Sequence, residues 1–263
     1  MTDDNHSHSP APPPIPAASL HPANISLADI VAYRCGSATG ALTDRAEVAR
    51  ARLMARRQDQ IEHLHDLLHA NYPVTRAALS DGVFRDLCAT YVRDIITLYD
   101  GWGSQSGFAA HCQAHPPLGA FPYLYDLVQL EWAICQSRKA ASAYRLEMDD
   151  LLLDEGELPV ALHPSVHILH VGFDVLGLHQ AFHAAGVAVT EVAPASDLIL
   201  VWRDRNHVPR QMRLSPRQDQ FLSSLLDTEN LCQTFKDLNG RDQNDLYAFL
   251  GDVIRDGLFV AAV

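Results

Sequence analysis

The sequence predicts an α+β protein, in which an N-terminal all-helical domain precedes a small winged-helix-like α+β domain. Between residues 40 and 155 the apolar side chains recur every three or four positions, which is typical of amphipathic helices. After residue 160, alternating β-rich segments come first and short helical segments follow them. The length of 263 residues also fits two modest domains better than one. We therefore expect a helical domain at 40–155 and an α+β domain at 160–263.

The first residues predict no folded element. Residues 1–28 are rich in Pro, Ser and Ala. Such a segment buries too little apolar surface to offset the entropy lost when it becomes ordered. We expect a flexible Pro-rich tail at 1–28.

A long helix is predicted over residues 44–70. Asp44 is a candidate N-cap because Glu47 follows it three residues later, as in a capping box. Pro73 ends this helix, since the residue before a proline avoids helical geometry. Further helices with buried apolar faces are predicted at 74–79, 83–99 and 123–147, with a Gly- and Pro-rich loop at 101–117 and an acidic linker at 149–157.

The second domain begins with strands. Residues 204–206 have the composition of a turn, so the strands at 197–203 and 207–214 are expected to form a hairpin. Ser215 is a candidate N-cap for the helix that follows. The other predicted elements are a strand at 166–175, helices at 178–185, 215–226, 231–238 and 243–256, and a last strand at 259–263.

Composition and charge limit the possible partners and location. Twenty basic and thirty-two acidic side chains give a net charge of −12, whereas a protein that binds nucleic acid through its phosphates is normally basic. No apolar run approaches the ~20 residues of a membrane-spanning helix, and the N-terminus lacks the pattern of a secretory signal. The five cysteines are scattered, which argues against a disulfide framework. We expect a cytoplasmic protein that does not bind membranes, and the charge makes nucleic-acid binding the minority interpretation.

No pattern in the sequence resembles an active site. The glycines at 36–40 lack the Lys-Ser/Thr of a phosphate-binding loop, and those at 172–177 have the wrong spacing for a dinucleotide site. His179 and His183 have the i,i+4 spacing of a two-histidine metal site, but no third ligand is apparent. We therefore expect no catalytic residue, no cofactor and no metal site.

Three stretches of the sequence carry a family resemblance. They are Tyr72–Asp94 with its Tyr-Pro start, the apolar segment 123–141 that contains Leu130-Glu131-Trp132, and LILVWRDRNHVPRQMRL at 198–214. Together with His163-Pro164 and the closing DVIRDGLFV, they resemble the HvfC/BufC family of peptide-modification chaperones, which also carries an older label as a DNA-binding domain family. The resemblance covers most of residues 45–263, and the chain departs from it in the loop 100–120 and in an insertion around 176–195.

The resemblance implies a partner role and no catalysis. Members of this family look like companions of multinuclear non-haem iron oxidases, which are TIM-barrel enzymes that modify ribosomally made peptides (RiPP biosynthesis). The second subunit of the methanobactin system is a relative of this kind. The implied function is to bind the oxidase as a heterodimer and to present a Cys-containing precursor peptide through a peptide-recognition-like winged-helix domain. The iron belongs to the oxidase.

The predicted strand 207–214 is the candidate peptide site. If it lies at a sheet edge, a peptide can add to it as a further strand through main-chain hydrogen bonds. The arginines around it would then steer an acidic leader peptide toward the strand, although ordinary solvated strand faces are the alternative interpretation. The candidate peptide-binding residues are Arg203, Arg205, Val208, Arg210, Gln211, Arg213 and Arg217.

The alternative function is that of a DNA-binding transcriptional regulator, which the winged-helix-like prediction and the arginines suggest. A winged helix needs a basic recognition helix. Residues 221–230 instead carry Asp227 and Glu229, and they contain no Lys or Arg.

Overall fold

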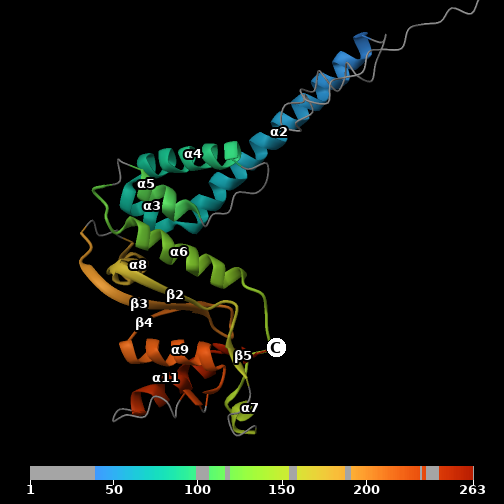
Figure 1. Ribbon diagram of the computed structural model, residues 1–263. Helices are drawn as coiled ribbons and strands as arrows, with labels where there is room; N and C mark the ends of the chain where they lie inside the picture. The colour runs from blue at the N-terminus through green and yellow to red at the C-terminus, as the bar shows by residue number, and fades with distance from the viewer. Residues whose placement is uncertain are drawn as a thin grey trace, which may run out of the picture. The chain divides into compact units, whose positions relative to one another are not determined.

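A computed structural model of the chain describes residues 39–98, 107–115, 119–153, 159–186, 191–231, 233–234 and 243–262 (Figure 1). The chain divides into two compact units, Met1–Glu62 and His63–Val263. The described elements are helices and small antiparallel sheets, which confirms the predicted α+β class. The tail predicted at 1–28 and most of the helix predicted at 231–238 lie outside the described residues.

The first described element is helix α2, Thr39–Asn71. It begins five residues before Asp44, so Asp44 lies inside the helix and the N-cap predicted there is wrong. The intervening Ala and Leu are strong helix formers, and they extend the helix toward its N-terminus. Within the first unit, the side chains of residues 47–60 are all exposed. The C-terminal end before Pro73 agrees with the prediction.

Three helices follow α2 and share an aromatic core. They are α3 (Pro73–Leu79), α4 (Asp81–Leu98) and α5 (Phe108–Ala114). The ring of Phe108 contacts Tyr72, Phe84 and Tyr91 at centroid distances of 4.9, 6.2 and 5.1 Å. The sequence predicted α3 and α4 but only a loop at α5. Burial of Phe108 and Cys112, one helical turn apart, stabilises this short helix despite the Gly and Pro residues around it.

Helix α6 spans Leu124–Lys139 and ends eight residues before its predicted end. Arg145 instead forms an antiparallel bridge with Val260, and Leu146 is buried. The backbone N–H of Leu146 donates to the carbonyl of Phe259 at 3.0 Å. Tertiary pairing thus overrides the helical propensity of residues 140–147.

The larger sheet contains β2 (His167–Phe173), β3 (Pro194–Arg203) and β4 (Pro209–Leu214) in the order β2-β3-β4. All neighbours are antiparallel, and Leu200 lies opposite Ile168 on one side and Met212 on the other. The predicted hairpin between β3 and β4 is confirmed. Helix α8 (Val175–Ala185) connects β2 to β3, close to the short helix predicted there.

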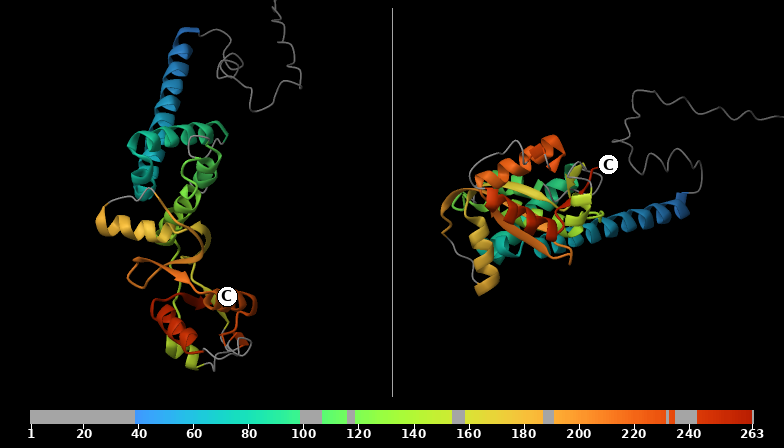
Figure 2. Two further views of the ribbon diagram at one scale, coloured as in Figure 1. Left: turned by 90° about the vertical axis from the view of Figure 1, so that its left-hand side faces the viewer. Right: turned by 90° about the horizontal axis from the view of Figure 1, so that it is seen from below.

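Helices cover both faces of this sheet (Figures 1 and 2). Ile199 and Val201 pack against residues of α3, α6 and α8, whereas Leu200 and Trp202 pack against α9 (Pro216–Thr228) and α11 (Gln243–Arg255). A strand that is buried on both sides reads as a continuous apolar run, which explains LILVW at 198–202. The core on the first face draws on segments of both expected domains, 40–155 and 160–263. The division into those two domains stays a prediction.

The smaller sheet pairs β1 (Val160–Leu162) with β5 (Phe259–Ala261). The bridge between Arg145 and Val260 adds a further extended segment. At three residues, β1 is too short to show a periodicity, and the sequence did not predict it. Part of the predicted acidic linker is helix α7 (Met148–Leu153), where the Asp150 carboxylate accepts the backbone N–H of Glu147 at 2.8 Å. Among the described helices, none is both long and apolar enough to cross a membrane.

Candidate functional site

The turn between β3 and β4 is a three-residue hairpin loop. The backbone N–H of Asp204 donates to the carbonyl of Val208 at 2.9 Å, and that of His207 donates to the carbonyl of Asp204 at 3.0 Å. His207 has a φ of 64°, the left-handed conformation that closes such a loop after a type I turn. The Asp204 carboxylate accepts the N–H groups of Asn206 and Val208, both at 2.9 Å. Burial acts to raise the pKa of Asp204, but these bonds and Arg210 together lower it.

This turn determines which groups of β4 face away from the sheet. Since Asp204 and Val208 form a hydrogen-bonded pair, and such pairs alternate along antiparallel strands, residues 210, 212 and 214 bond to β3. The backbone N–H and C=O groups of Gln211 and Arg213 therefore point to the outer side of β4. Because β4 is the last strand of the order β2-β3-β4, these groups line a sheet edge.

The opposite edge of the sheet, along β2, is partly closed. The Asp126 carboxylate, which projects from α6, accepts the backbone N–H of Gly172 at 2.7 Å. Burial raises the pKa of Asp126, while hydrogen bonds from Gly172 and Phe173 act to lower it. A side chain that occupies an edge donor competes with an added strand. The two edges therefore differ, and β4 is the better acceptor for a further strand.

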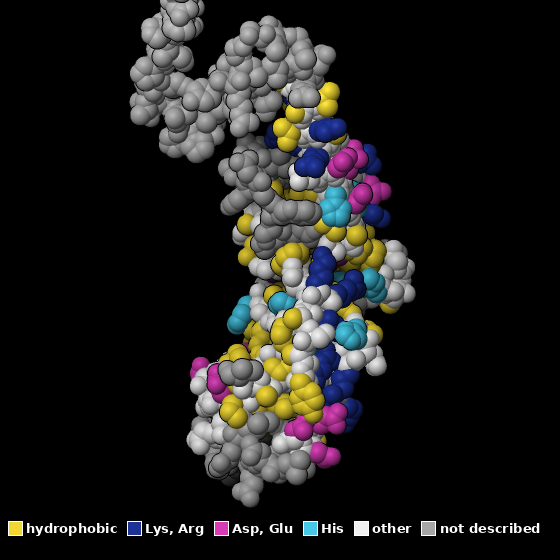
Figure 3. Space-filling view, turned by 90° about the vertical axis from the view of Figure 1, so that its right-hand side faces the viewer, with side chains coloured by type: hydrophobic (Ala, Val, Ile, Leu, Met, Phe, Trp, Pro, Cys, Tyr) yellow, Lys and Arg dark blue, Asp and Glu magenta, His cyan; other side chains and the backbone are white. Residues whose placement is uncertain are grey.

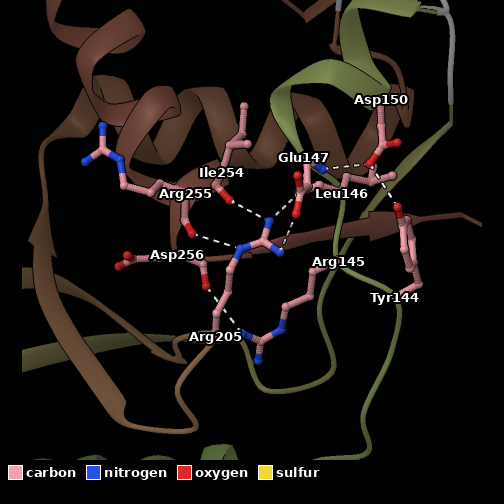
Figure 4. Close-up of polar contacts among 9 residues, drawn as sticks. All are labelled: Tyr144, Arg145, Leu146, Glu147, Asp150, Arg205, Ile254, Arg255 and Asp256. Carbon is pink, nitrogen blue, oxygen red and sulfur yellow. Dashed lines mark hydrogen bonds and ion pairs between the residues drawn. The ribbon is translucent and has the colours of Figure 1, made fainter.

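Two of the predicted peptide-binding arginines make contacts inside the protein. Arg203 is 5% exposed, and its Nη1 donates to the carbonyl of Arg138 at 3.1 Å. Figure 4 shows the Arg205 guanidinium among the carbonyl groups that end α11: its Nε donates to Arg255 at 2.9 Å and its Nη2 to Ile254 at 3.3 Å. Nη2 also donates to the carbonyl of Leu146 at 2.9 Å. Both side chains therefore tie the hairpin to neighbouring segments.

The arginines of β4 are already paired with carboxylates. Arg210 lies 2.9 Å from Asp204, and Arg213 contacts Asp174 and lies 2.8 Å from Asp197. The sequence did not show the partners of Arg213, because Asp174 and Asp197 lie far from β4 in the chain.

Figure 3 shows Lys and Arg side chains in a band on one face of the molecule, with Asp and Glu side chains at its lower end.

The other three predicted residues differ in exposure. Val208 is 45% exposed at the turn, Gln211 is partly buried on β4, and Arg217 is partly buried in the first turn of α9. Ser215 caps α9 as predicted: its hydroxyl accepts the N–H of Gln218 at 3.2 Å, and the Gln218 side chain accepts the N–H of Ser215. The structure thus places Arg210, Gln211 and Arg213 on β4 and Val208 at the turn before it.

A groove of about 640 Å³ lies on the α9/α11 side of the sheet. Trp202 and Met212 contribute to it from the hairpin, and Phe249 and Val253 contribute from α11. The sequence did not predict it, because it requires the packing of α11 against the hairpin. The polar residues that line it are Ser215, Gln218, Asp245, Asp252, Arg255 and Asp256.

His179 and His183, the candidate metal pair of the sequence, lie close together on α8. The Nε2 atoms of His179 and His183 lie 3.3 Å apart, and burial together with His183 and Arg138 lowers the pKa of His179 to about 4. In the described part of the chain, no three His, Cys, Asp or Glu side chains gather as metal ligands would.

Glu131 has a structural contact that sequence reasoning missed. Its carboxylate is buried at the N-terminus of α3, where it accepts the backbone N–H of Val74 at 2.8 Å and that of Thr75 at 3.0 Å. The hydroxyl of Thr75 donates to the same carboxylate at 2.6 Å. Leu130-Glu131-Trp132, the segment most specific to the family resemblance, therefore contains a residue that holds two helices together.

Comparisons of the chain with models of known protein families and with curated proteins found no match.

Proposed function

We propose that this protein is a non-catalytic partner subunit of an iron-dependent peptide-modifying oxidase and that it helps to present a Cys-containing precursor peptide. The resemblance of residues 45–263 to peptide-modification chaperones suggests the oxidase and the class of peptide. The edge of β4 carries the recognition step of the proposal, because it offers outward donors and acceptors at Gln211 and Arg213. A winged-helix-like arrangement of β3, β4, α9 and α11 is part of the same proposal.

Main-chain recognition suits a chaperone. A strand added to β4 gains hydrogen bonds that do not depend on its sequence, while neighbouring side chains supply selectivity. Arg205, in the turn of the β3–β4 hairpin, donates to the carbonyls of Arg255 and Leu146. These bonds hold the hairpin in place, so its outer edge lies on a rigid element.

The test uses a matched pair of substitutions at one position. Gln211→Pro removes an outward N–H, whereas Gln211→Ala keeps it, and neither change removes a bond between β3 and β4. Peptide binding should weaken by about tenfold in the proline variant and stay near the wild-type value in the alanine variant, since one main-chain bond contributes ~0.5–1.5 kcal/mol and the ring also blocks the incoming strand.

The experiment co-expresses the full chain with an oxidase and a Cys-containing peptide encoded beside it, and then measures co-purification and peptide affinity. A stable complex with the oxidase and the predicted difference between the two variants would support the proposal. Absence of that complex, or equal peptide affinity in two folded variants, would refute it.

DNA binding is the alternative function. The described helix α9 carries one arginine, Arg217, against Asp219 and Asp227, which does not favour the phosphate backbone. Binding to duplex DNA at physiological salt, with a steep dependence on salt concentration, would replace the proposed function.

A further inference from the structure

We infer that the groove beside β4 selects an extended peptide that carries Lys or Arg side chains at alternate positions. This inference rests on the proposed peptide recognition at β4 and specifies the chemistry of the peptide. It differs from the sequence-based expectation of an acidic leader.

The charge of the groove supports a basic occupant. Asp245, Asp252 and Asp256 line it, against one arginine, Arg255, which lies 2.9 Å from Asp252. The arginines expected to bind acidic side chains, Arg210 and Arg213, are already paired with carboxylates. An acidic peptide would therefore meet no unpaired cation on β4, and it would meet net negative charge in the groove.

The strand geometry places alternate side chains of the peptide at this groove. Met212 lies in the groove and packs on the α9/α11 side of the sheet, as do Leu200 and Trp202. Side chains of a strand added beside β4 alternate between the two faces in the same way. Every second side chain of the added strand would then face the α9/α11 side, and one of them would lie next to Met212. Its aliphatic part would pack on the apolar floor formed by Trp202 and Met212, with its charge toward Asp245 and Asp252 of α11.

The floor also contains an unused hydrogen-bond donor. Trp202 is 6% exposed, and its indole Nε1 is buried without a hydrogen-bond partner among the described residues. The edge strand β4, the apolar residues of the groove and its three aspartates, Asp245, Asp252 and Asp256, together fit an extended basic segment.

The experiment uses two labelled ten-residue peptides, one that alternates Lys with Thr and one that alternates Glu with Thr. Titrated against the full chain, the Lys peptide should bind at least tenfold more tightly. The double variant Asp245→Asn/Asp252→Asn should weaken the Lys peptide by about three- to tenfold. The matched control, Asp59→Asn/Asp66→Asn on α2, changes the net charge equally and should have little effect.

The outcomes separate the two ideas. If both peptides bind equally and Gln211→Pro weakens both, strand addition stands and the charge selection is wrong. If the two double variants weaken the Lys peptide equally, the preference reflects net charge and the groove assignment is wrong. If neither peptide binds, both the groove assignment and peptide recognition at β4 are refuted, whereas binding to the oxidase is judged by co-purification.

Discussion

The buried carboxylate of Glu131 gives the sharpest test of how the helical segments are held together. Its two oxygens accept three hydrogen bonds, from Val74 N–H, Thr75 N–H and the Thr75 hydroxyl. In Glu131→Gln one oxygen becomes an amide NH₂ group, which cannot accept. At least one backbone N–H of α3 is then buried without a partner, at a cost of ~1–3 kcal/mol.

The pH dependence of this cost follows from the pKa of Glu131. Burial raises that pKa from 4.5 to about 7, although the three hydrogen bonds act to lower it. Because the folded protein binds this proton more tightly than the unfolded chain, proton binding by Glu131 adds stability that is fully present below about pH 4.5 and is lost as the pH rises through 7. Between pH 5 and pH 8 this change amounts to ~2–3 kcal/mol. The cost of the acceptor missing from Glu131→Gln remains at pH 8.

The glutamine variant lacks this titration, whereas all other groups are common to both proteins. The difference in unfolding free energy between wild type and Glu131→Gln should therefore be larger at pH 5 than at pH 8. For a folded unit of the size of His63–Val263, 1 kcal/mol corresponds to ~2–4 °C in Tm. The Tm of Glu131→Gln should therefore lie several degrees below that of the wild type at pH 8, and further below it at pH 5.

Thermal unfolding at both pH values, with the exposed Glu191→Gln as control, measures the effect. A Tm equal to that of the control, or a difference that shrinks toward pH 5, would refute this account of Glu131.

Two further predictions concern the hairpin turn. His207→Gly should stabilise the protein by up to about 1 kcal/mol in chemical denaturation, because His207 has a φ of 64° that glycine adopts without strain; a loss of stability would contradict the assigned turn. Arg205→Ala should cost ~2 kcal/mol, since its guanidinium donates to the carbonyls of Leu146, Ile254 and Arg255. The exposed Arg57→Ala is the control, and an equal effect of both substitutions would show that these contacts contribute little.

Much of the fold could be predicted from local patterns in the sequence. The alternation in 207–214 and the polar turn before it predicted the hairpin, and Ser215 as a candidate N-cap predicted the start of α9. Two of the errors share one cause, which is dependence on distant partners. Residues 145–146 leave the helical pattern to pair with β5, and α5 forms because Phe108 is buried against Tyr72, Phe84 and Tyr91.

The candidate site was predictable only where it depends on local sequence patterns. The sequence located the strand, because its alternation is local, and the structure places β4 at a sheet edge. It did not reveal that Arg213 pairs with Asp174 and Asp197, nor that the aspartates of α11 face the hairpin across a groove. These relations depend on how distant segments pack. The charge around a site is therefore harder to predict than its position.

The pairing of β5 has a consequence for synthesis on the ribosome. Strand β5 pairs with Val160–Leu162 and also bridges to Arg145, and Phe259 is fully buried in the core that also contains Leu200 and Trp202. Translation must therefore pass residue 261 before this core can close, whereas the aromatic cluster around Phe108 can form much earlier. The nascent chain would carry the uncovered α9/α11 face of its sheet until then, and this interval is when it is most exposed to aggregation or to capture by folding factors.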